Sequence, residues 1–148
     1  MIVEGNNNLE SLFNFIPELV IIIGLLSVIL LEIIPGLRKW IYPFTLGVIA
    51  SSFLILILPL VLPKIFNQTF DSIFMELVVV DPFSTFFKII FLFSTFIIVL
   101  VSESSVEIKD KIKAEYYFLL LVVLLGMFLM ASSINLLMIY LAIEMLSI

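Results

Sequence analysis

The chain has 148 residues, of which 64% are apolar and 13% are charged, and its formal net charge is −5. Soluble domains are about 45–50% apolar and about 25% charged, so this composition excludes a water-soluble globular domain and indicates a protein of the lipid bilayer. The absence of cysteine and histidine excludes disulfides, thiolate metal sites and a Ser-His-Asp triad, and the negative charge argues against nucleic acid as a partner.

The N-terminal segment does not resemble a signal peptide. Its first 15 residues contain Glu4 and Glu10 and no Lys or Arg, whereas a signal peptide begins with a basic region. The first apolar run, at about 17–34, is long enough to span a membrane. Glu18 and Glu32 lie at opposite ends of this run, and we expect both to be interfacial, Glu18 as an acid that suits the first turn of the helix.

Three more apolar runs are long enough to cross a bilayer, which takes about 20 residues. They predict helices at about 41–62, 82–102 and 115–132. A fifth run, 136–148, would give about 20 Å of helix, less than the bilayer's thickness of about 30 Å. We therefore predict an all-α polytopic membrane protein with four transmembrane helices and the start of a fifth, forming one unit over residues 1–148.

The segment between the second and third helices has a different character. Residues 67–80 are rich in β-branched and aromatic side chains, which are typical of strands. We predict a short hairpin or extended loop on the membrane surface. Asp81, which precedes Pro82, is predicted to cap the helix that follows.

The distribution of basic residues predicts the orientation. One set of loops holds five Lys or Arg residues and the other holds one, and loops rich in these residues face the inside. The N-terminus is therefore expected outside, in the periplasm or intermembrane space. The five are Arg38, Lys39, Lys109, Lys111 and Lys113, and the one is Lys64.

Glu144 is the main candidate for function. It lies nine residues after Asn135, about 13 Å into the fifth helix and so near the bilayer midplane. Tyr140, Glu144 and Ser147 are spaced to share one helix face, and we expect this face to meet protein or water rather than lipid, with Glu144 buried. A carboxyl group at this depth suggests a proton relay. The alternative is a protonated side chain that makes one helix–helix hydrogen bond.

Lys88 is the second charge inside a predicted span, about two turns into the third helix. Ser84, Lys88, Thr95 and Ser102 are spaced to share one face. A Lys this close to a helix end can extend its ammonium to the interface. We favour that position, or a structural ion pair, over a direct role in proton transfer.

Three segments resemble one known family. They are residues 81–88 (DPFSTFFK), residues 115–133 with their EYY and GMFLMASS motifs, and residues 135–147 (NLLMIYLAIEMLS). Together they resemble the antiporter-like membrane subunits of respiratory complex I, and the final EMLS favours the NADH dehydrogenase subunit 2 branch. The similarity covers essentially the whole chain and is most specific over 81–148.

The resemblance implies a fold like that of monovalent cation/proton antiporters and a place in the membrane arm of a proton-pumping NADH:ubiquinone oxidoreductase. The glutamate that this family requires for proton translocation falls on Glu144. The chain would be a non-redox subunit without cofactor or metal, while FMN, iron–sulfur clusters, NADH and quinone belong to the complex. Its partners would be other membrane-arm subunits and the lipid bilayer.

Family members are longer and carry buried lysines in further helices, so the resemblance also implies a split or truncated subunit, with another chain supplying the remaining helices. The Ile and Phe bias suggests an AT-rich genome, which favours the mitochondrial inner membrane over a bacterial plasma membrane. Two other functions stay open. The chain could belong to a monovalent cation/proton antiporter complex, or it could have a purely structural role in assembly.

Overall fold

The computed structural model describes residues 15–34, 36–61, 72–73, 78–79, 81–104 and 112–147. Four of its helices are long and apolar enough to cross a membrane, and a shorter apolar helix follows them, which confirms the predicted fold class. In chain order the elements are α2 (Ile16–Ile33), η1 (Arg38–Trp40), α3 (Ile41–Val61), β1 (Ser72–Ile73), β2 (Val78–Val79), α4 (Pro82–Glu103), α5 (Lys113–Ser132) and α6 (Leu136–Leu146).

The predicted hairpin is present between α3 and α4. Strands β1 and β2 pair antiparallel, with Ser72 opposite Val79 and Ile73 opposite Val78. The remainder of the predicted 67–80 segment lies outside the described residues, as do Lys64, Lys109 and Lys111 of the charge count.

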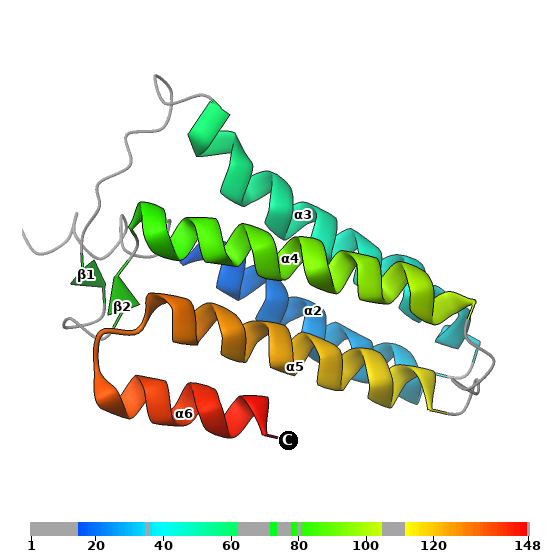
Figure 1. Ribbon diagram of the computed structural model, residues 1–148. Helices are drawn as coiled ribbons and strands as arrows, with labels where there is room; N and C mark the ends of the chain where they lie inside the picture. The colour runs from blue at the N-terminus through cyan, green and yellow to red at the C-terminus, as the bar shows by residue number, and fades with distance from the viewer. Residues whose placement is uncertain are drawn as a thin grey trace, which may run out of the picture.

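Helices α2, α3, α4 and α5 form a four-helix bundle (Figure 1). Helix α2 packs against α3 and α5, and α4 packs against the same two helices. Helices α2 and α4 are therefore diagonal partners across the centre of the bundle. Helix α6 packs against α5 at the edge of the bundle. We call the end where α2, α4 and α6 begin the hairpin end, because β1 and β2 lie there (Figure 1).

The centre of the bundle is apolar along most of its length. Ile21 and Val28 of α2, Leu92 of α4, and Leu124 and Phe128 of α5 have no exposed surface. Many large apolar side chains point outward instead, which suits helices whose surroundings are lipid rather than water.

Two glycines permit close approach of neighbouring helices. A Cβ at Gly24 would lie only 2.5 Å from Val48 Cγ1, so a larger residue would not fit between α2 and α3 without a shift. A Cβ at Gly126 would lie 3.1 Å from Met145 Cβ and 3.3 Å from the carbonyl oxygen of Ala142, which brings α6 onto α5. Small residues at such positions are typical of helix packing in membranes.

Candidate functional site

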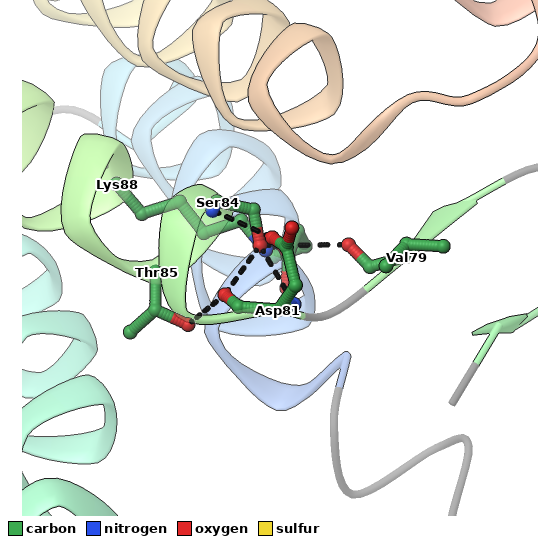
Figure 2. Close-up of polar contacts among 6 residues, drawn as sticks. Val79, Asp81, Ser84, Thr85 and Lys88 are labelled. Atoms are coloured by element: carbon green, nitrogen blue, oxygen red, sulfur yellow. Dashed lines mark hydrogen bonds and ion pairs between the residues drawn. The ribbon is translucent and has the colours of Figure 1, made fainter. Parts of the chain in front are cut away.

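Asp81 fixes the start of α4. Its Oδ1 accepts the backbone N–H of Ser84 at 2.7 Å, and Ser84 Oγ accepts the backbone N–H of Asp81 at 3.1 Å. This reciprocal arrangement satisfies two N–H groups that the helix leaves unpaired, and it confirms the predicted cap. Figure 2 shows this cap and Lys88, which lies one helical turn beyond Ser84.

The predicted polar face of α4 lies inside the bundle. Ser84, Lys88, Thr95 and Ser102 are all buried. Thr95 Oγ1 donates to the carbonyl oxygen of Phe91 at 2.8 Å, so its hydroxyl is satisfied within its own helix. Ser102 Oγ and Tyr117 Oη lie 3.0 Å apart and join α4 to α5 at the end opposite the hairpin.

Lys88 forms a buried ion pair with Glu18. Its Nζ lies 2.6 Å from Glu18 Oε1, and the two side chains are 2% and 1% exposed. Since Glu18 belongs to α2 and Lys88 to α4, the pair bridges the diagonal of the bundle. The ion pair considered for Lys88 is therefore present, and its ammonium points into the bundle rather than out to the surface. Glu18 does lie in the first turn of α2, but on the side that faces the bundle centre.

The surroundings of this pair are mainly apolar. Lys88 Nζ lies 5.8 Å from the centroid of the ring of Phe128, which belongs to α5. Ile21 is one turn beyond Glu18 and Leu92 is one turn beyond Lys88, and both are fully buried. Glu18 Oε2 has no hydrogen-bond partner among the described residues. Desolvation of both charges offsets much of their attraction, so net stabilisation is a poor explanation for this pair.

Glu144 lies apart from this pair, on α6. The α6 side that meets α5 contains the fully buried Ala142 and Met145. Glu144 and Ser147 are exposed on the other side, as is Tyr140 at 62%. The three therefore share a face, as the spacing predicts. The expected burial of Glu144 is not found within this chain, because the described residues place no helix over that face.

The remaining ion pair lies on the surface at the opposite end. Glu32 Oε1 lies 2.7 Å from Arg38 Nη2, and both side chains are partly exposed, as an interfacial Glu32 predicts. The described residues hold no cluster of three Asp or Glu side chains that could bind a metal ion.

No family model matches the chain. Curated relatives do match it over most of its length. The chain is 36% identical over 140 residues to NADH-quinone oxidoreductase subunit N 2 of Chloroherpeton thalassium, which covers 90% of this chain and 26% of that protein. This chain is a homologue of NADH-quinone oxidoreductase subunit N.

Two further subunit N proteins support this identification. The protein of Methylovorus glucosotrophus is 29% identical over 141 residues, covering 93% of the chain and 28% of the relative. The protein of Anaeromyxobacter is 28% identical over 147 residues, covering 96% and 27%. The chain thus spans about a quarter of the length of the curated subunit N proteins it matches. These names confirm the resemblance to complex I stated from the sequence.

Sequence reasoning missed Glu18 as the partner of Lys88. Glu18 and Lys88 are opposite charges within otherwise apolar segments, and the predicted topology places both near the same end of their helices. That combination could have suggested a pair. The diagonal packing of α2 and α4, which brings the two side chains together, is a tertiary feature that no local pattern contains.

Proposed function

We propose that this chain is a membrane-arm subunit of a proton-pumping NADH:quinone oxidoreductase and that Glu144 takes part in proton translocation. The similarity to subunit N proteins over 90% of the chain supports the complex, and four helices of spanning length support its place in the membrane. The chain spans about a quarter of the length of the subunit N proteins that it matches. FMN, iron–sulfur clusters, NADH and quinone are bound elsewhere in the complex.

The exposed position of Glu144 on an apolar helix carries the proposal about this residue. A charged side chain at the centre of a membrane helix costs about 2.5–3.5 kcal/mol even on the mildest scale. Another surface must therefore cover the face formed by Tyr140, Glu144 and Ser147, with water or a cation beside the carboxylate. A change in that neighbouring charge alters how tightly Glu144 holds its proton, which couples the carboxyl group to events elsewhere in the complex.

The distribution of basic residues supports an orientation with the hairpin end outside, facing the periplasm or the intermembrane space. Arg38, Lys39 and Lys113 all lie at the opposite end of the bundle. The Ile and Phe bias of the sequence favours a mitochondrial inner membrane over a bacterial plasma membrane, and this stays a prediction.

Replacing Glu144 with Gln tests this function, because the amide keeps the size of the side chain but cannot release a proton. Glu115→Gln is the matched control, since Glu115 is an exposed acid in the first turn of α5. In membrane vesicles that contain the complex, we expect Glu144→Gln to abolish NADH-driven proton uptake while assembly is retained, and Glu115→Gln to pump normally. If Glu144→Gln pumps normally in an assembled complex, Glu144 has only a structural role.

Mass spectrometry of the mildly solubilised native assembly distinguishes the proposed complex from a cation/proton antiporter. We expect the chain to purify with flavin and iron–sulfur subunits and with a polypeptide that supplies further antiporter-like helices. Purification with antiporter-type subunits alone would refute membership of complex I.

A further inference from the structure

The Glu18–Lys88 pair has unused hydrogen-bonding capacity. Glu18 Oε2 is fully buried and has no partner among the described residues. Lys88 Nζ carries three N–H donors, and Glu18 Oε1 is the acceptor that the described residues provide. An unpaired buried carboxylate oxygen costs the full desolvation of that atom. A water molecule needs two to four polar partners in a buried site, and this pair offers two adjacent ones.

Buried polar side chains lie next to the pair on its hairpin side. On the other side, Ile21 of α2, Leu92 of α4 and Leu124 of α5 are apolar and fully buried. The fourth helix, α3, contributes the buried Ser52, whose Oγ also has no partner among the described residues. On the hairpin side, Ser132 lies one turn from Phe128 on the same face of α5, and its buried Oγ has no partner among the described residues. Ser84, one turn from Lys88 towards the hairpin end, is also buried and polar.

We propose that Glu18 and Lys88 form a hydrated proton-exchange site that opens to the hairpin end of the bundle and is closed to the other end. A water molecule bridges Glu18 Oε2 and a second N–H of Lys88 Nζ. The ammonium passes a proton to this water, which passes one of its own protons to the carboxylate. The ion pair becomes a neutral amine and a neutral acid, and the net charge does not change. In a low-dielectric site the two states can be close in free energy, because the neutral state avoids desolvated charges.

Few other charges act on this site. On α4 the nearest titratable group among the described residues is Asp81, two turns away towards the hairpin end. The described part of α3 has no Asp, Glu or Lys, and its Tyr42 lies at the opposite end, as do Lys113, Glu115, Tyr116 and Tyr117 of α5. The site does not depend on Glu144 or on the proposed function.

Infrared difference spectroscopy tests the proton exchange. The protein, purified with its native assembly and reconstituted in liposomes, is perfused alternately with H₂O and D₂O buffers of the same pH. We expect the carbonyl band of a buried protonated carboxyl and its shift in D₂O, because transfer within the pair leaves the number of bound protons unchanged and needs no acidification. The band should be lost in Glu18→Gln and kept in Glu32→Gln, which alters the exposed ion pair of the same helix. If Glu18→Gln alone does not assemble, Glu18→Gln combined with Lys88→Met removes both charges together.

Cysteine labelling tests the access of water, because the chain has no cysteine of its own. A small water-soluble methanethiosulfonate reagent reacts with thiolates that contact water, and mass spectrometry of this chain detects the product. We expect Ser132→Cys to be labelled and Leu92→Cys, on the closed side of the pair, to remain unlabelled. A carboxyl band that persists in Glu18→Gln, the absence of any such band, or a Ser132→Cys that resists labelling would each overturn the proposal. Loss of pumping in Glu144→Gln, or its retention, leaves these results unchanged.

Discussion

Removing the ammonium of Lys88 while Glu18 remains should strongly destabilise the bundle. At 2.6 Å and an effective dielectric constant of about 20, the attraction between the two charges is about 6 kcal/mol. Desolvation costs several kcal/mol for each ion and cancels much of this gain. Lys88→Met keeps the carboxylate buried but removes its counter-ion, so we expect a loss of about 3–5 kcal/mol.

The double variant Glu18→Gln with Lys88→Met should recover most of this loss, because it leaves no unpaired charge. Replacing a buried ion pair with neutral groups of similar volume is often neutral or stabilising. The exposed pair Glu32–Arg38 is the matched control, with a similar distance of 2.7 Å but partly exposed side chains. Arg38→Met should cost less than about 1 kcal/mol.

The assay is the fraction of the purified assembly that remains monodisperse, with this chain bound, after heating in mild detergent. We expect the order of stability to be wild type, then Arg38→Met close to it, then the double variant, and Lys88→Met well below all three. Equal losses for Lys88→Met and Arg38→Met would refute the reasoning, and so would a double variant as unstable as the sum of its two single changes.

Two further predictions concern the elements that hold the pair in place. Asp81→Ala removes the acceptor for the Ser84 N–H and should lower the stability of the helix by about 0.5–2 kcal/mol. We expect faster amide hydrogen exchange in the first turn of α4. Unchanged exchange there would show that the cap is dispensable. Gly24→Ala places a Cβ 2.5 Å from Val48 Cγ1, whereas a Cβ at Gly47 meets nothing within 4 Å. We therefore expect Gly24→Ala to lower the thermal stability by about 1–3 kcal/mol, Gly47→Ala to have little effect, and Val48→Ala to restore part of the Gly24→Ala loss. A Gly47→Ala variant that is equally destabilised would contradict this packing argument.

The sequence predicts the helices well, because their lengths and apolar character are local properties fixed by the thickness of the bilayer. Helix α3 occupies 41–61 against a prediction of 41–62, and α4 occupies 82–103 against 82–102. The cap at Asp81 was also predictable, since an Asp before a Pro at the start of an apolar run satisfies a local requirement. Properties that depend only on neighbouring residues in the chain are therefore recovered.

The positions of the charged side chains depend on other helices and were harder to predict. Glu18 has the sequence context of a first-turn acid, and that context does not tell which side of α2 will face the bundle centre. The spacing of Ser84, Lys88, Thr95 and Ser102 predicts one shared face of α4, and the structure buries that face inside the bundle. The partner of Lys88, Glu18, lies 70 residues earlier in the chain, so the pair follows only from the packing of the bundle.

The two glutamates differ in where their environment comes from. Glu18 lies in a bundle in which each of the four helices packs against at least two others, so the chain itself supplies its burial and its cation. Glu144 lies on α6, which is attached mainly through α5, and its face is exposed. The surroundings of Glu144 are therefore set by whatever covers α6, and they can change with that surface. A carboxyl group whose neighbours can change suits coupling to other parts of an assembly, whereas Glu18, held on all sides by its own bundle, suits local exchange with one end of the membrane.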